Sequence, residues 1–302
     1  MITRLNKSKI MSNGKEAILS RLSGRRLVIV GGNGQMGRLF RRYFQNSGLE
    51  TLSLDIDNQE KAPEIVERAA VVVICVPIDV TVEVIAGLPD LSPQTILADL
   101  TSVKEKPLTA MLKRHPGPVI GLHPMFGPDI SEMRDQRLIY CLGRNARSCA
   151  VLLDIIASWG IKLVETQAAE HDRNMAMIQA QRHFINFCLG SNLMDAGVDM
   201  EKLLAMGTPA FHLEMMQMGR FFSQQAELYA DIIMASENNL TCIRNFCNTM
   251  VNLLELLENH DREAFIRRFS AICLWLGEYG NQLNRHSKIA FPKIISAINQ
   301  QG

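Results

Sequence analysis

The fold is decided by residues 27–37, whose sequence is LVIVGGNGQMG. A short β-branched run leads into a glycine-rich turn, and a segment with helical character follows directly. The turn contains the pattern G-x-G-x-x-G, whose glycines permit a tight turn, close approach of the backbone to a pyrophosphate, and packing of a helix on a strand. N–H groups at the start of that helix favour phosphate. The stretch predicts a dinucleotide site with the candidate residues Gly32, Asn33, Gly34, Gln35, Met36 and Gly37.

The next strand-like run, at 50–54, indicates which dinucleotide binds. It ends at Asp55, at about the distance beyond Gly37 that the dinucleotide pattern requires for its acidic residue. A carboxylate at this place can accept hydrogen bonds from ribose hydroxyls and would repel a 2′-phosphate, which favours NAD over NADP. Asp57 could take the same role, and a surface acid that binds nothing is the other alternative. Val76 and Pro77, at the end of a further apolar run, are additional candidates for cofactor contact.

The first half of the chain alternates between strand-like and helix-compatible segments. Apolar runs lie at 71–76, 95–100, 119–122, 138–142 and 162–164, and helical patterns lie at 60–69, 80–86, 105–114 and 148–159. This alternation predicts an α/β Rossmann-type domain with a doubly wound, mostly parallel sheet. Ligands bind beyond the carboxyl ends of the strands in such sheets. The loops at 77–79 and 101–104, and the stretch 121–128, are therefore expected to face the ligand.

The composition changes after about position 170. The part of the chain before this point holds 13 of the 20 glycines and 9 of the 11 prolines, and helical spacing of apolar residues follows, as at 243–257. These features predict an all-α domain. Its many methionines favour a core or a subunit interface, and hence a homodimer. The predicted organisation is a tail at 1–24, an NAD-binding domain at 25–169, and a helical substrate and dimerisation domain at 170–302.

Overall composition narrows the class of partner. The formal net charge is +1, which predicts neither nucleic-acid nor membrane binding and favours a small-molecule ligand. No apolar run approaches the roughly 20 residues that a membrane helix needs, so a cytoplasmic location is expected. The basic segment at 1–24 is expected to be disordered or a short helix, with an organellar transit peptide as the alternative. The cysteine and histidine spacings predict no metal site.

The stretch GLHPMFGP, at 121–128, places a lone histidine between a strand and a turn. If that strand end faces the nicotinamide, His123 is positioned to take a hydroxyl proton, a role that supplies about 10²- to 10⁴-fold in rate. Ser102 and Lys104 on the neighbouring loop could hold the hydroxyl and a substrate carboxylate. The alternatives are a structural histidine in a tight turn and a lysine that caps the following helix.

Two places in the chain could supply further polar contacts to a substrate. Arg220 and Gln224, four positions apart, are expected to share a helix face among apolar neighbours. A guanidinium in that setting suggests a bound carboxylate, and an intramolecular ion pair is the alternative. His171, in the triplet 170–172, could be another substrate contact, while Asp172 could be only an acid favoured by the helix dipole.

Together these motifs resemble the prephenate dehydrogenase family, above all the dehydrogenase half of the bifunctional chorismate mutase/prephenate dehydrogenases of enteric-type bacteria. The resemblance extends over about 26–290 and rests on the segments 28–38, 102–104, 121–128, 170–172 and 229–234. It implies oxidative decarboxylation of prephenate by NAD to 4-hydroxyphenylpyruvate, CO₂ and NADH, in tyrosine biosynthesis. Because tyrosine resembles this product, it could occupy the same site near His171, and feedback inhibition by tyrosine is a further prediction.

The resemblance also implies roles for individual residues. His123 accepts the proton of the ring hydroxyl and Arg220 binds the ring carboxylate, while other substrate-side positions are matched by Ser102, Lys104, His171, Gln224 and Tyr229. The chain departs from the family pattern at His212, where the bifunctional relatives have an arginine. The short segment at 1–24 cannot build a mutase domain, so no chorismate mutase activity is expected.

Two other functions remain open at this point. Arogenate dehydrogenase performs the same reaction on the transaminated substrate, and His212 keeps this alternative open because it affects how the side chain is held. A dimer that binds NAD without turnover is the alternative from another class, and it would leave His123 without a catalytic role.

Overall fold

The computed structural model describes residues 26–299, and the predicted tail at 1–24 lies outside the described residues. The chain forms two compact units that divide between Met175 and Ala176. The division predicted after position 169 falls within helix α7 (Ala168–Met175), which belongs as a whole to the first unit.

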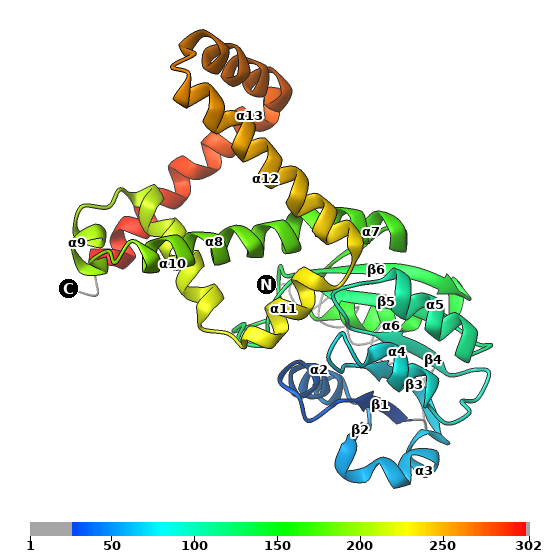
Figure 1. Cartoon of the computed structure of the whole chain (residues 1–302). Helices are drawn as coiled ribbons and strands as arrows, with labels where there is room; N and C mark the ends of the chain where they lie inside the picture. Colours follow the sequence, from blue (N-terminus) through cyan, green and yellow to red (C-terminus); the bar gives the residue numbers. More distant parts are fainter. Residues whose placement is uncertain (1–25, 300–302) are drawn as a thin grey trace, which may run out of the picture. The chain divides into compact units, whose positions relative to one another are not determined.

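The first unit is built on a seven-stranded sheet (Figure 1). The strand order is β2-β1-β3-β4-β5-β6-β7. Strands β1 to β5 are parallel, β6 is antiparallel to β5, and β7 is parallel to β6. The mostly parallel sheet expected from the sequence is confirmed. Its strands are β1 (Arg26–Val30), β2 (Thr51–Leu54), β3 (Ala69–Ile74), β4 (Ile96–Asp99), β5 (Val119–Pro124), β6 (Arg137–Arg144) and β7 (Lys162–Glu165).

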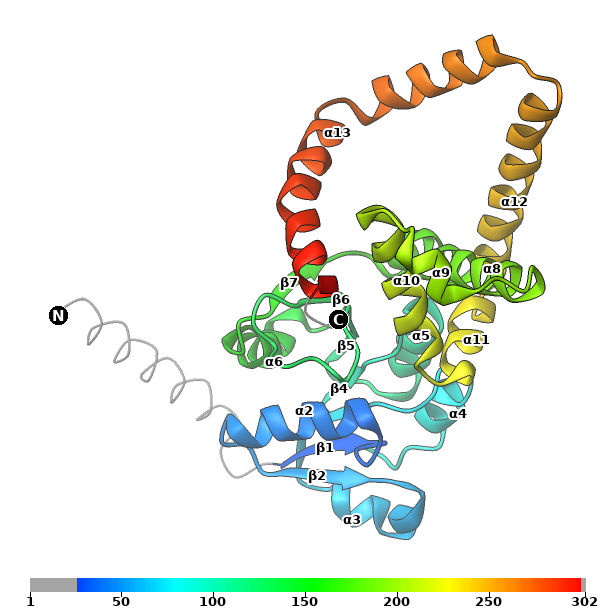
Figure 2. The same ribbon diagram turned by 90° about the vertical axis from the view of Figure 1, so that its left-hand side faces the viewer.

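Helices cover both faces of this sheet, which explains why its strands are apolar on both sides. Along β1, Leu27 and Ile29 belong to one core with residues of α2 and α6, while Val28 and Val30 belong to another with residues of α3, α4 and α5 (Figure 2). The helices are α2 (Gln35–Asn46), α3 (Ala62–Val66), α4 (Thr81–Ala86), α5 (Glu105–Arg114) and α6 (Ala146–Ser158). The expected helix at 60–69 is shorter, because a 3₁₀ turn, η1 (Ile56–Lys61), precedes it and Pro63 stands in its first turn.

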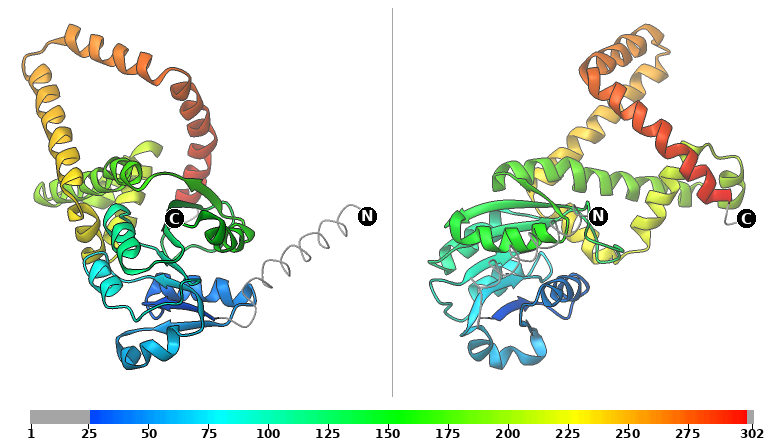
Figure 3. Two further views of the ribbon diagram at one scale, coloured as in Figure 1. Left: turned by 90° about the vertical axis from the view of Figure 1, so that its right-hand side faces the viewer. Right: turned by 180° about the vertical axis from the view of Figure 1, so that it is seen from behind.

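The second unit is all helical, as expected (Figure 3). A π-helical segment, η2 (Ala176–Gln181), opens it. The apolar spacing at 243–257 falls within α12, which confirms that amphipathic helix. The long α13 is kinked at Gly277, whose φ of 48° lies in the left-handed region that glycine adopts readily. The helices are α8 (Arg182–Asp195), α9 (Met200–Ala205), α10 (Pro209–Phe222), α11 (Ala226–Met234), α12 (Glu237–Glu258) and α13 (Arg262–Asn299).

Helices α12 and α13 carry large apolar side chains that are exposed in the described part of the chain, 26–299. Leu274 and Trp275 are 83% and 80% exposed, and Met250, Leu254 and Leu257 are also exposed. Apolar surface on this scale marks an interaction site. Among the described residues, no helix combines the length and the apolar character that crossing a membrane requires.

Candidate functional site

The glycine-rich turn between β1 and α2 is shaped for close approach of a ligand. A Cβ at position 37 would lie 2.3 Å from the Gly31 carbonyl oxygen, so helix α2 can pack here only with glycine. A Cβ at position 34 would meet only that same oxygen, at 3.2 Å, so the turn is open on the side of Gly34. No side chain caps the start of α2 and no acid lies in its first turn. The helix dipole there is therefore available to a phosphate.

Asp55, directly after β2, is tied to the same turn. Its carboxylate accepts hydrogen bonds from the Asn33 backbone N–H, at 3.2 Å, and from the Ser53 hydroxyl. A carboxylate has about four acceptor positions, so it can also accept from ribose hydroxyls. Asp57 lies in the exposed η1 turn. The open turn, the uncapped helix and the neighbouring carboxylate fit an adenine dinucleotide.

Val76 and Pro77 follow β3 at the same edge of the sheet. The side chain of Val76 approaches Gly31 closely, because a Cβ built at position 31 would lie 3.0 Å from it. The Thr81 hydroxyl donates to the Pro77 carbonyl oxygen at 2.8 Å, which joins this loop to the start of α4. The structure thus brings these two candidates together with the glycine-rich turn.

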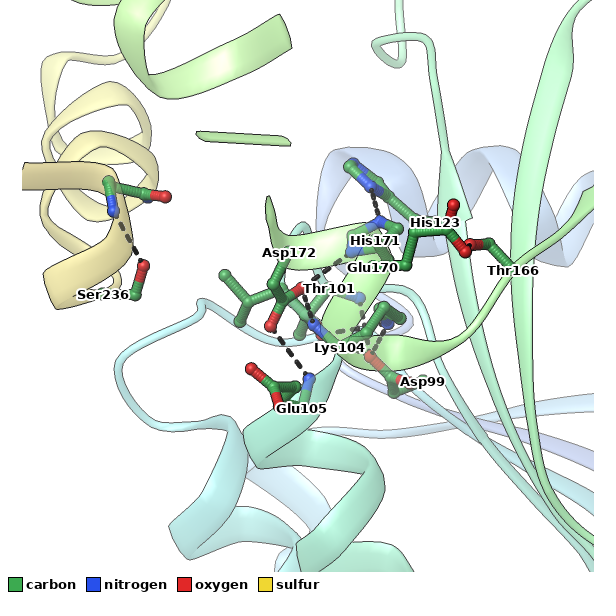
Figure 4. A network of polar contacts seen from close by, with 12 residues as sticks. Asp99, Thr101, Lys104, Glu105, His123, Thr166, Glu170, His171, Asp172 and Ser236 are labelled. Atoms are coloured by element: carbon green, nitrogen blue, oxygen red, sulfur yellow. Dashed lines mark hydrogen bonds and ion pairs between the residues drawn. The ribbon is translucent and has the colours of Figure 1, made fainter. Parts of the chain in front are cut away.

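His123 lies at the carboxyl end of β5 and begins a chain of buried polar contacts (Figure 4). Its Nδ1 is 2.8 Å from His171 Nε2, and His171 Nδ1 is 2.7 Å from an Asp172 carboxylate oxygen. His123 is 2% and His171 1% exposed. Burial, together with the neighbouring His171 and Lys104, lowers the pKa of His123 well below 6.5. Its imidazole is therefore neutral at neutral pH and can accept a proton.

Asp172 binds the start of a different helix. Its two carboxylate oxygens accept hydrogen bonds from the backbone N–H groups of Lys104, at 2.8 Å, and Glu105, at 3.0 Å. Burial would raise the pKa of Asp172, but the hydrogen bonds from His171 and from these two N–H groups outweigh burial and lower it. The suggestion that Asp172 is only a first-turn acid of its own helix is therefore wrong. The adjacent histidine in the triplet 170–172 was the available signal.

Lys104 is fully buried and its ammonium has three oxygen acceptors within the first unit. These are the Asp99 carboxylate, the Leu122 carbonyl at 2.8 Å and the Thr101 hydroxyl at 3.3 Å. Burial lowers the pKa of Lys104, and Asp99 acts in the opposite direction. The ammonium joins the ends of β4 and β5 directly before His123. We therefore propose that the Lys104 ammonium holds the ends of β4 and β5 in place and does not contact the substrate.

Neighbouring residues complete this part of the site. The backbone of Lys104 precedes α5, but its side chain turns to Asp99 and makes no cap contact with the helix. Asp99, which sequence analysis did not single out, ends the apolar strand β4. An acid at the end of a buried strand was the only local signal. Ser102, half-buried, lies in the same turn between β4 and α5.

The remaining candidates lie in the second unit. His212 and Arg220 stand on α10, about two helical turns apart. Gln224 does not share their helix, because α10 ends at Phe222 and the Ser223 hydroxyl donates back to the Arg220 carbonyl at 2.9 Å. The expectation of a common helix face for Arg220 and Gln224 is therefore wrong.

Tyr229 on α11 belongs to an aromatic cluster. Its ring centroid is 4.2 Å from that of Phe221 and 4.7 Å from that of His183. Burial lowers the pKa of His183 to about 4, so this histidine is neutral and acts in packing. Tyr229 thus links α8, α10 and α11 within the second unit.

Thiols and metal ligands form no centre in the part of the chain that the structure describes. All seven cysteines are free, and burial, aided by Asp55 and Asp99, raises the pKa of Cys75 to about 12. Within 26–299, no three histidine, cysteine or acidic side chains are grouped to hold a metal ion.

Comparison with known families and proteins gives two matches to family models. The model described as "Prephenate dehydrogenase, nucleotide-binding domain" matches residues 44–137, and "Prephenate dehydrogenase, dimerization domain" matches residues 167–271. A T-protein from Enterobacter agglomerans is 44% identical over 258 residues, which are 85% of this chain and 69% of that protein.

Solved structures share the fold at lower identity. The prephenate dehydrogenase of Aquifex aeolicus, in complex with hydroxyphenyl propionate and NAD⁺, superposes with a TM-score of 0.63 at 17% identity over 83% of this chain and 97% of that one. Arogenate dehydrogenase of Synechocystis gives 0.63 at 18% identity over 84% and 99%.

Proposed function

Since the chain belongs to the prephenate dehydrogenase family, we propose that it oxidises prephenate with NAD to 4-hydroxyphenylpyruvate, CO₂ and NADH in tyrosine biosynthesis. The observation that carries this proposal is His123, a buried neutral imidazole at the carboxyl end of β5, in a unit whose β1–α2 turn fits a dinucleotide. Ligands of doubly wound sheets bind at this edge.

The residues of the chain have distinct tasks in this proposal. NAD, when bound, takes a hydride from the ring carbon that carries the hydroxyl. Its pyrophosphate would be held by the turn formed by Gly32, Asn33, Gly34, Gln35, Met36 and Gly37. The Asp55 carboxylate would accept hydrogen bonds from its ribose, and Val76 and Pro77 would also contact the cofactor. His123 accepts the hydroxyl proton, and Ser102 orients that hydroxyl. Loss of the ring carboxylate as CO₂ then makes the ring aromatic, which drives the reaction forward.

In this proposal, residues of the second unit recognise the substrate. Arg220 binds the ring carboxylate, for which a guanidinium offers paired donors. Gln224, Tyr229 and His212 contact the remainder of the substrate, His212 at the position where an arginine would hold the side chain. Because arogenate differs from prephenate only in that side chain, arogenate dehydrogenase is the second candidate, favoured by His212.

The decisive experiment follows NADH formation by the purified chain with NAD and either prephenate or arogenate. We expect turnover with prephenate, with a higher kcat/KM than with arogenate. A higher kcat/KM with arogenate would move the assignment to the second candidate. No turnover with either substrate, in a protein that binds NAD, would leave the non-catalytic NAD-binding dimer.

Replacing Asp55 tests the choice of cofactor. Asp55→Ser is expected to raise KM for NAD about 10- to 100-fold, because hydrogen bonds to a charged group contribute about 1.5–3 kcal/mol. It should also improve the use of NADP, since a negative charge near the 2′-phosphate is removed. Steady-state kinetics with both cofactors measure the two effects. Asp57→Ser is the matched control, and an equal response of both variants would contradict the assignment.

Replacing Arg220 tests carboxylate binding. Arg220→Gln is expected to raise KM for prephenate about 10- to 100-fold with a smaller change in kcat, because a charge-assisted contact made before the reaction is lost. Arg244→Gln, at an exposed arginine of the same unit that pairs with Glu237 at 3.9 Å, serves as the control. An unchanged KM in the Arg220 variant would remove this role.

We also propose that the chain forms a homodimer through its second unit. The exposed apolar side chains of α12 and α13 need a partner surface, and a second copy supplies one of the same character. A monomer in light scattering would contradict this.

Tyrosine is proposed as an inhibitor because it resembles the product, and a turnover rate insensitive to tyrosine would remove that proposal.

A further inference from the structure

The contacts beyond His123 bear on where the substrate proton resides during hydride transfer, before it returns to the ring oxygen. His123 is buried, and the titratable groups that lower its pKa include His171 from α7 and the Lys104 ammonium from the start of α5. Both disfavour a positive charge on His123, as does burial itself. A proton held on this imidazole is therefore unfavourable. An acceptor further along the hydrogen-bond chain would remove that cost.

The direction of the hydrogen bonds follows from Asp172. Its pKa is lowered, so the group is a carboxylate, and a carboxylate can only accept. His171 Nδ1, 2.7 Å away, must therefore donate to Asp172. In neutral His171, Nε2 then carries no proton and accepts from His123 Nδ1, at 2.8 Å. This arrangement leaves Nε2 of His123 as its basic nitrogen.

The same contacts offer a paired place for the positive charge. Asp172 is held by the backbone N–H groups of Lys104 and Glu105, so its position does not depend on His171. An imidazolium at His171 would lie against this carboxylate, whereas one at His123 would lie near Lys104 and His171. Opposite charges in contact favour the ionised forms of both groups.

We propose that Asp172 and His171 form a proton relay behind His123, so that the proton taken from the substrate is compensated by a proton passed on to His171. This rests on the proposed function. The substrate O–H bond breaks as an N–H bond forms at Nε2 of His123. The Nδ1–H bond of His123 breaks as an N–H bond forms at Nε2 of His171. The positive charge resides on His171, paired with Asp172, while the O–H electron pair forms the ring C=O bond and the hydride of the breaking ring C–H bond would pass to NAD⁺. After CO₂ is lost, the electron pair of the broken C–C bond makes the ring aromatic. The ring oxygen then takes a proton back from Nε2 of His123, and His171 returns its proton to Nδ1 of His123.

Two variants separate relay from simple positioning. In His171→Gln the side-chain oxygen can still accept from His123 Nδ1, but it cannot take up a proton. In Asp172→Asn the compensating charge is lost. Each is expected to lower kcat about 100-fold while KM for prephenate and the Kd for NAD stay within about threefold. His115→Gln is the control, because His115 is a buried histidine of the same unit whose ring nitrogen contacts the Thr95 carbonyl, at 2.7 Å, away from the relay.

Two further measurements report on the protons directly. Single-turnover NADH formation in mixtures of H₂O and D₂O should show two transferred protons in the parent and one in His171→Gln. Imidazole ¹⁵N shifts of the resting protein, assigned with His123→Asn and His171→Gln, should show the proton of His123 on Nδ1. The ¹⁵N measurement needs no catalysis, so it stands even if the proposed function fails.

The outcomes are distinguishable. If the parent turns over and both folded variants keep kcat within threefold of it, the relay is wrong. A resting His123 protonated on Nε2 would overturn it as well. If Asp172→Asn does not fold because α5 loses its partner, His171→Gln and the ¹⁵N shifts still decide. An inactive parent would instead reject the proposed function and leave the ¹⁵N result to judge the hydrogen-bond direction.

Discussion

Replacement of His123 by asparagine is expected to lower kcat for NADH formation by about 10²- to 10⁴-fold, the contribution of a positioned general base. The asparagine amide can donate toward His171 in place of Nδ1, but it offers no basic nitrogen at the position of Nε2. KM for prephenate and the Kd for NAD should therefore change little. Stopped-flow measurement of NADH, with NAD binding as the test of folding, separates loss of chemistry from loss of structure.

The pH dependence of kcat/KM is a second test of His123. His123 acts as a base only when unprotonated, so kcat/KM should fall as the pH drops through its pKa. Because burial, His171 and Lys104 lower that pKa well below 6.5, kcat/KM should stay level from neutral pH down to below 6.5. An acid limb centred above 6.5, or a His123→Asn variant as active as the His115→Gln control, would contradict the assignment.

The second large effect concerns stability. Lys104→Met is expected to lower the free energy of unfolding of the first unit by about 3–5 kcal/mol, because it leaves the fully buried Asp99 carboxylate without its cation. Methionine keeps most of the side-chain volume, so the lost stability is due to the missing positive charge and not to a cavity. Urea unfolding followed by Trp159 fluorescence, in a Trp275→Phe background, confines the measurement to the first unit, where Trp159 packs against Phe44.

A double variant supplies the control for that experiment. In Lys104→Met/Asp99→Asn the uncompensated charge is absent, so most of the lost stability should return. Asparagine can still accept from the Thr101 backbone N–H, which Asp99 binds at 3.0 Å. A single variant that loses less than about 1 kcal/mol, or a double variant no more stable than the single one, would show that the pair does not hold β4 and β5 together.

Local patterns predicted the strands of the sheet, α12 and the cofactor turn, but not every helix boundary. The G-x-G-x-x-G string after a β-branched run predicted the β1–α2 turn, since the conformation of a glycine turn depends on residues next to one another in the chain. The apolar strands and the 243–257 spacing predicted the sheet and α12 for the same reason. The shared face of Arg220 and Gln224 failed because helical spacing does not show where a helix ends, and here Ser223 ends it.

The polar contacts behind His123 could not be predicted from local sequence patterns. Asp172 binds the backbone of Lys104, which is far away along the chain, and the side chain of Lys104 turns from an expected substrate contact into a partner of Asp99. Neither pairing has a periodic or adjacent signature, because each exists only after β4, β5 and α7 have packed. Burial lowers the pKa values of His123 and Lys104, and hydrogen bonds lower that of Asp172, in surroundings that exist only in the folded unit.

The sequence by itself therefore determined the class of fold, the cofactor turn, the candidate base and the family, because these are carried by neighbouring residues and by motifs in a fixed order. Only the tertiary structure decided that Lys104 is enclosed, that Asp172 anchors α5, and that His171 stands between Asp172 and His123. These are contacts between distant segments in a low-dielectric interior, where hydrogen-bond partners and charge depend on packing that no single stretch contains.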